Sequence, residues 1–124
     1  MSKVSLRAMK CHGRTLRYVK KQTEEICLRA VKQNGWALEY VKDQTEEICL
    51  EAVRESGYAL PYVKDQTEEI CLAAIKKDGH SLKYIKNQTE EICSMAVRKN
   101  ADTLQYIRDP SVKQRVMEKL GLKA

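Results

Sequence analysis

The segment QTEEICLEAVRESGYALPYVKD, residues 44–65, reveals the architecture because the chain repeats it. The string QTEEIC begins at residues 22, 44, 66 and 88, a period of 22 residues. Three further columns keep this period: Tyr18, Tyr40, Tyr62, Tyr84 and Tyr106; Leu16, Leu38, Leu60, Leu82 and Leu104; and Gly13, Gly35, Gly57 and Gly79. Such a period is the signature of a solenoid, in which each unit buries its apolar face against its neighbours.

Each unit predicts two helices. In the first full unit, Thr23 supplies an N-cap hydroxyl, and Glu24 and Glu25 place negative charge at the positive end of a helix dipole. Apolar residues then recur at helical spacing, which predicts a helix over about 24–34, and Gly35 is expected to end it as a left-handed C′ residue. A second apolar run follows, at Ala37, Leu38, Tyr40 and Val41. It predicts a short helix of about two turns.

The absence of period-2 alternation argues against strands, so we predict an all-α fold, an α-solenoid of helix–turn–short-helix units. We expect one domain over 1–124, with irregular end units as in most repeat arrays. Pro110 and Ser111 look like a helix start with Ser111 as the cap, and Val4, Leu6, Ala8 and Met9 align with a first helix that lacks its cap. The expected parts are a partial repeat 1–21, full repeats 22–43, 44–65, 66–87 and 88–109, and a capping helix 110–124.

Composition restricts the setting in which the protein works. The 124 residues are 43% hydrophobic and 32% charged, and no stretch approaches the ~18 to 20 apolar residues of a membrane helix. The N-terminus has no apolar block or cleavage site typical of a secretory signal, so we expect a reducing cytosol. The net charge of +6 is uneven: +7 over residues 1–21, −5 over 22–96 and +4 over 97–124.

The cysteines suggest packing and not chemistry. Four of the five recur with the repeat, at Cys27, Cys49, Cys71 and Cys93. Equivalent positions should lie about 8 to 10 Å apart, beyond the ~7 Å Cα limit of a disulfide, so we expect free thiols in the core. Cys11 and His12 could form a nucleophile or metal pair, but a divergent helix end explains them as well. We predict no enzyme, catalytic residue, metal site or cofactor.

The string QTEEICLEAVRESGYALPYVK, from Gln44 to Lys64, resembles the short tandem helical repeats of a domain of unknown function that abounds in giant amoebal viruses and in some bacteria and phages. The resemblance covers nearly the whole chain. It implies a helical repeat fold and a viral or phage-like origin. It implies no activity, because the family has no established site to transfer.

Positions that differ between units are not required by the fold and are therefore available for function. Two such columns lie three residues apart and should share a helix face: Arg14, Trp36, Tyr58, His80 and Asp102; and Arg17, Glu39, Pro61, Lys83 and Gln105. An aromatic centre flanked by charges has the composition of a binding hot spot. We therefore predict a protein-binding site of Arg14, Trp36, Glu39, Tyr58, His80 and Lys83, the alternative being unconstrained positions that face solvent.

A basic column offers a second hypothesis. A stripe of Lys20, Lys42, Lys64, Lys86 and Arg108 could follow a phosphate backbone, which would make the chain a nucleic-acid binder. The net charge of −5 over residues 22–96 favours charge complementarity at helix ends instead. We expect a protein partner, with the chain monomeric or paired end to end as a homodimer.

Overall fold

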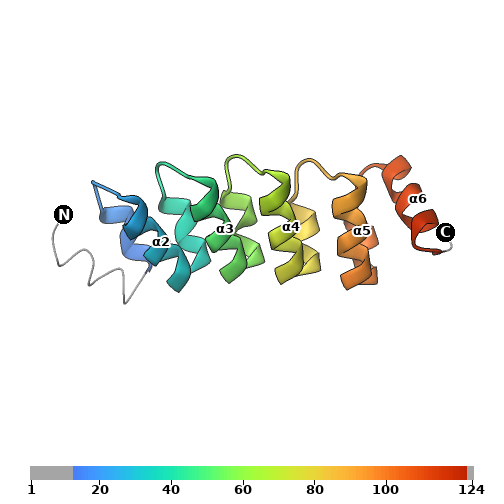
Figure 1. Ribbon diagram of the computed structural model, residues 1–124, viewed down its shortest axis with the longest axis horizontal. Coiled ribbons are helices and arrows are strands. Elements are labelled where there is room, and N and C mark those ends of the chain that lie inside the picture. Colours follow the sequence, from blue (N-terminus) through green and yellow to red (C-terminus); the bar gives the residue numbers. More distant parts are fainter. Residues whose placement is uncertain (1–12, 123–124) are drawn as a thin grey trace.

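The computed structural model describes residues 13–122, with side chains from Leu16 onward. Within this part of the chain every regular element is a helix, and α-helices alternate with 3-10 helices (Figure 1). The α-helices are α2 (Glu24–Gln33), α3 (Glu46–Glu55), α4 (Glu68–Lys77), α5 (Glu90–Lys99) and α6 (Pro110–Lys119). The 3-10 helices are η1 (Gly13–Tyr18), η2 (Gly35–Tyr40), η3 (Gly57–Tyr62), η4 (Gly79–Tyr84) and η5 (Ala101–Tyr106).

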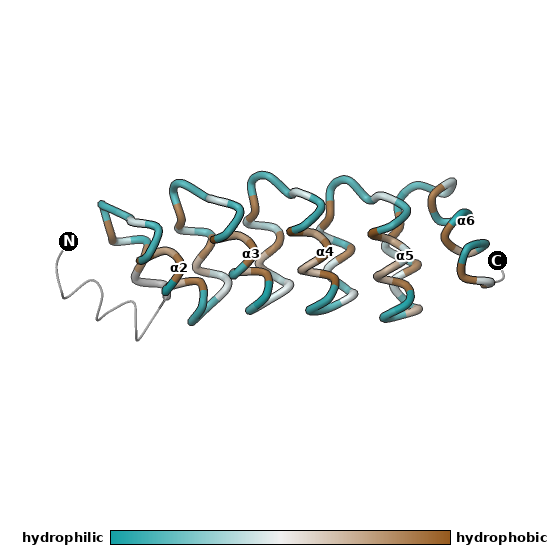
Figure 2. The backbone as a smooth tube through the Cα atoms, viewed as in Figure 1, coloured by the Kyte–Doolittle hydropathy of each residue, from teal (hydrophilic) through white to brown (hydrophobic). Residues whose placement is uncertain are grey.

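The units stack in chain order into an elongated array with two layers. Each α-helix packs on the next α-helix and each 3-10 helix on the next 3-10 helix, and η1 and α6 lie at opposite ends of the array (Figure 1). The helices contain the hydrophobic segments, and the turns that lead into the α-helices are hydrophilic (Figure 2). The predicted α-solenoid with a period of 22 residues is confirmed.

Each full unit contributes the same positions to the core. In the first, these are Ile26, Cys27, Ala30, Val31, Ala37, Leu38 and Val41. The leucine column is fully buried up to Leu82 and partly buried at Leu104. The tyrosine column is core only in part, because Tyr62 and its counterparts pack against the core from its edge and Tyr18 is 70% exposed.

The α-helices begin as predicted and end differently. The Thr23 hydroxyl accepts a hydrogen bond from the Ile26 amide at 3.3 Å, and Thr45, Thr67 and Thr89 repeat this cap. The prediction of a left-handed Gly35 is wrong: extended Asn34 ends α2, and the only positive φ among the described residues is at Gly121. Gly35 serves close packing instead, because a Cβ there would lie 2.5 Å from the Ala52 carbonyl oxygen of the next unit.

The second helix of each unit spans six residues and is a 3-10 helix. The side chain before it caps its start: the amides of Trp36, Tyr58 and His80 donate to Asn34, Ser56 and Asp78. These short helices position both variable columns. The second residue of each helix belongs to the column of Trp36, and the fifth belongs to the column of Glu39.

The array closes with α6. Its cap is Asp109, whose carboxylate accepts from the Ser111 amide at 2.9 Å, with Pro110 in the first turn. The predicted Ser111 cap is therefore wrong by two residues. Val112 and Val116 are buried against the preceding unit. The predicted N-terminal segment from Val4 to Met9 and the pair Cys11–His12 lie outside the described residues.

The repeated cysteines are buried and free, as predicted. Burial raises the pKa of Cys49, Cys71 and Cys93 to about 11, and it also raises the pKa of Cys27. These thiols are therefore core groups that resist ionisation. In the described part of the chain, no helix is long and apolar enough to cross a membrane.

Candidate binding surface

A row of glutamines joins the units along the turn edge, the upper edge in Figure 1. We call Gln22, Gln44, Gln66 and Gln88 the glutamine row. The Gln66 amide nitrogen donates to the Tyr84 carbonyl at 3.0 Å, and its oxygen accepts from the Lys86 amide at 2.9 Å. The other three glutamines repeat both bonds with the next unit. Sequence reasoning missed this role, although an identical glutamine in four surface turns was a usable signal.

The predicted nucleic-acid stripe lies along the same edge. All five of its residues, Lys20, Lys42, Lys64, Lys86 and Arg108, are exposed. Several reach back to the preceding unit: the Lys64 ammonium donates to the Lys42 carbonyl at 3.4 Å, and the Arg108 guanidinium donates to the Lys86 carbonyl at 3.0 Å. These cations thus have a structural partner in the stack.

A second row consists of rings that pair across units. We call Trp36, Tyr58 and His80, with Tyr62, Tyr84 and Tyr106 beneath them, the aromatic row. The ring centroids lie 6.4 Å apart for Trp36–Tyr62, 6.0 Å for Tyr58–Tyr84 and 6.1 Å for His80–Tyr106, in tilted or edge-to-face geometry. Each variable residue therefore rests on the constant tyrosine of the next unit.

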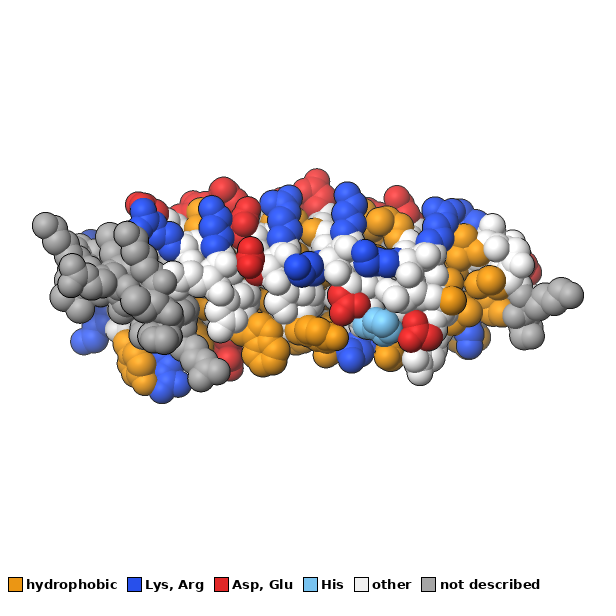
Figure 3. Space-filling model, turned by 90° about the horizontal axis from the view of Figure 1, so that it is seen from below, with side chains coloured by type: hydrophobic (Ala, Val, Ile, Leu, Met, Phe, Trp, Pro, Cys, Tyr) orange, Lys and Arg blue, Asp and Glu red, His pale blue; other side chains and the backbone are white. Residues whose placement is uncertain are grey.

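The rings of Trp36 and Tyr58 in this row are partly open to solvent. Trp36 is 50% exposed and Tyr58 is 42% exposed. The Trp36 indole N–H also donates to the Ser56 hydroxyl of the next unit at 3.3 Å. Figure 3 shows hydrophobic side chains gathered along the lower edge of that view, beside basic and acidic ones. The surface thus combines half-exposed aromatic rings with charged side chains, and contacts with the next unit hold the Trp36 ring in position.

Two cations, Lys83 and Arg17, lie against tyrosine rings. Both belong to the second variable column, the fifth residue of each 3-10 helix. The Lys83 ammonium is 5.8 Å from the Tyr58 centroid, 5.2 Å from Tyr84 and 5.8 Å from Tyr106. The Arg17 guanidinium lies 4.7 Å from the Tyr18 centroid. Hydrogen bonds, first to Tyr18 and then to Tyr40, raise the pKa of Arg17. These distances are within the range of cation–π attraction.

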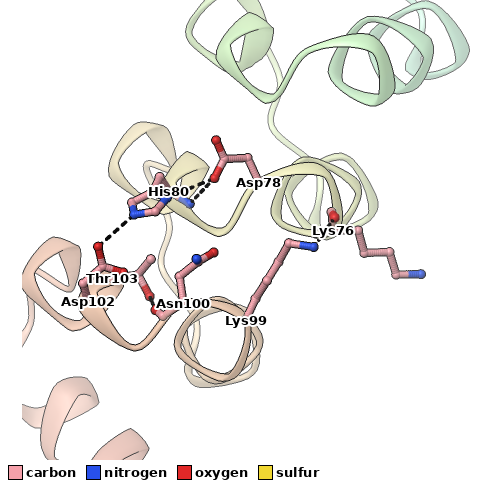
Figure 4. Close-up of polar contacts among 7 residues, drawn as sticks. All are labelled: Lys76, Asp78, His80, Lys99, Asn100, Asp102 and Thr103. Atoms are coloured by element: carbon pink, nitrogen blue, oxygen red, sulfur yellow. Dashed lines mark hydrogen bonds and ion pairs between the residues drawn. The ribbon is translucent and has the colours of Figure 1, made fainter.

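At the C-terminal end of the aromatic row, His80 lies between two carboxylates. Its Nδ1 lies 3.1 Å from Asp78 and its Nε2 lies 3.0 Å from Asp102 of the next unit (Figure 4). The two carboxylates, Asp102 first, raise the pKa of His80 because they favour the imidazolium. His80 is partly buried and bridges two units through these carboxylates.

The structure brings most of the predicted protein-binding residues onto one surface. Trp36, Tyr58 and His80 belong to its aromatic row, and Lys83, three residues after His80 on η4, contacts that row. Glu39 is exposed on η2, at the position that Lys83 holds on η4. The side chain of Arg14 lies outside the described part.

A shallow hollow lies elsewhere, between α3 and α4. Leu50, Leu72 and Ala73 form its apolar floor, and charged side chains rim it: Arg54, Glu69, Lys76 and Lys77. Across residues 13–122, no three His, Cys, Asp or Glu side chains are grouped so that they could hold a metal ion.

The fold and its rows define a tandem helical-repeat protein in which two short helices build each unit. The chain belongs to the family described as Domain of unknown function (DUF4116), whose model matches residues 3–45 and 67–110. Each match spans about two units, and residues 46–66 between them continue the same pattern. No curated protein and no solved structure matches the chain.

Proposed function

We propose that this chain is a non-enzymatic protein–protein interaction module that binds its partner through the aromatic row. The observation that supports this proposal most is that Trp36 and Tyr58 are about half exposed while their rings rest on Tyr62 and Tyr84. Large side chains held in place lose little conformational freedom on binding. Such residues dominate binding hot spots.

Variation between units supports the same proposal. The units share one backbone, so the fold does not demand that Trp36, Tyr58 and His80 differ. A solenoid presents successive variable side chains at a fixed spacing, which suits recognition of an extended partner surface. From the family resemblance, we propose a viral or phage accessory protein that acts on a host protein in the host cytoplasm.

The test is capture of partners from a host lysate at two salt concentrations, with and without nuclease. The double variant Trp36→Ala/Tyr58→Ala should lose a salt-resistant protein partner that the unmodified chain retains. The control is Met117→Ala/Leu122→Ala, which removes apolar side chains from the end of the array and should retain the partner. Equal capture by both variants would refute the proposal.

The same experiment tests the basic stripe. Binding of a phosphate backbone weakens steeply with salt because counterions are released. Recovery that is sensitive to nuclease and salt, and indifferent to the aromatic substitutions, would point to Lys20, Lys42, Lys64, Lys86 and Arg108 and would overturn the aromatic row as the contact surface.

A further inference from the structure

The column that contains Lys83 shows a repeated position for a cation. Lys83 lies among the rings of Tyr58, Tyr84 and Tyr106, which are 25 residues before it, one after it and 23 after it. Arg17 lies on Tyr18, the next residue in its own unit. Two different cations thus use the same tyrosine column. The repeated backbone therefore creates this position for a cation, whichever side chain supplies the cation.

The repeat places a third such position in the middle of the array. The same offsets applied to Pro61 lead to Trp36, Tyr62 and Tyr84. Trp36 and Tyr62 are already paired at 6.4 Å, and Trp36 is half exposed. Pro61 carries no charge. In the part of the chain that the structure describes, the cation–ring contacts are those of Arg17 and Lys83.

We propose that Trp36, Tyr62 and Tyr84 form a binding site for a cationic side chain, arginine or lysine, of the partner protein. The inference rests on the proposed interaction surface and names the chemistry that this surface recognises. Tryptophan is the strongest aromatic partner for a cation, and a guanidinium also stacks on its face. In the unit over residues 44–65, the partner's cation takes the position equivalent to that of the Lys83 ammonium in the unit over residues 66–87.

The net charge of this unit favours such a ligand. The unit over residues 44–65 contains five acidic and two basic side chains. Glu39 holds the equivalent position one unit toward the N-terminus, where the column has a carboxylate in place of a cation. Lys83 opposes a second cation, but one unit of stacking is about 8 to 10 Å, close to the Debye length at physiological salt.

Trp36 reports directly on this site because it is the only tryptophan of the chain. The experiment titrates its fluorescence with the blocked peptide Gly-Gly-Arg-Gly-Gly and with the same peptide containing citrulline, the uncharged isostere of arginine. The arginine peptide should give a saturable change, and the citrulline peptide should bind at least about tenfold more weakly. Equal binding of the two peptides, or no response to either at millimolar concentration, would overturn the cation site.

The matched variant is Pro61→Lys, which supplies the site with a cation from the chain itself. The fold accepts it, because this column already contains Arg17, Glu39, Lys83 and Gln105. Pro61→Lys should weaken the arginine peptide at least about tenfold while the melting temperature stays near that of the unmodified chain. The control Gln114→Lys adds the same charge at an exposed position of α6 and should bind normally. Unchanged binding by Pro61→Lys would refute the proposal.

The two proposals fail in different ways. A lysate partner that is lost with Trp36→Ala/Tyr58→Ala but retained with Pro61→Lys would leave the interaction surface standing and overturn the cation site. A partner retained by both variants would overturn the interaction surface, and with it the cation site.

Discussion

The glutamine row and the aromatic row both place one side chain per unit on the surface, yet one never varies and the other does. Every glutamine gives both amide atoms to backbone groups of the next unit, as Gln66 does with Tyr84 and Lys86. The aromatic side chains touch the next unit mainly through a ring. A side chain that bonds to a repeated backbone must have one geometry. A side chain that rests on a ring can be Trp, Tyr or His.

The largest expected effect comes from the interior beneath the aromatic row. Leu60 is fully buried, so Leu60→Ala should lower the free energy of unfolding by about 2 to 5 kcal/mol. Tyr62→Ala should cost less because Tyr62 is partly exposed, and Tyr58→Ala less again. Urea unfolding followed by circular dichroism measures all three. If Leu60→Ala were as stable as Tyr58→Ala, our assignment of the core column would be wrong.

The next effect should come from the glutamine row. Gln66→Ala leaves the Tyr84 carbonyl and the Lys86 amide without their partner, which should cost about 1 to 3 kcal/mol. Gln33→Ala is the matched control, because Gln33 is exposed at the end of α2 and should tolerate alanine within about 0.5 kcal/mol. Equal urea midpoints for the two variants would show that the row does not hold the units together.

The alkylation rate of the buried thiols should distinguish the interior from the two surface rows. The pKa values of Cys49, Cys71 and Cys93 are raised to about 11 by burial, so almost no thiolate exists at pH 8. Alkylation by iodoacetamide, located by peptide mass mapping, should be far slower in the folded protein than in urea. Labelling of Cys71 at the unfolded rate would contradict its place in the core.

The smallest effect should come from His80. Its folded pKa is raised above the ordinary value of about 6.5 by Asp102 and Asp78. Its contribution to stability is therefore complete below about pH 6.5 and is lost as the pH rises through the folded pKa. Compared with His80→Gln, the unmodified chain should lose a little melting temperature between pH 6 and pH 8. Parallel melting curves for the two proteins would exclude a stabilising bridge between units.

Much of the local structure could be predicted because its causes lie within one unit. The Thr23 cap and the start of α2 follow from neighbours a few residues away. Gly35 could not be explained in this way, because the carbonyl of Ala52 that excludes a Cβ belongs to the next unit. The second helix was expected, but its 3-10 geometry was not.

The candidate surface shows the same division. The two variable columns identified Trp36, Tyr58 and Lys83 without any coordinates, because comparing units separates positions that the fold requires from positions that it leaves free. Only the stacking of units puts Tyr62 under Trp36, closes His80 between two carboxylates and carries Lys83 to three tyrosines. The amino-acid sequence by itself establishes the repeat, its helices and its buried columns, since these depend on periodicity. The pairings between units depend on distances across the stack, and the packed array alone determines those.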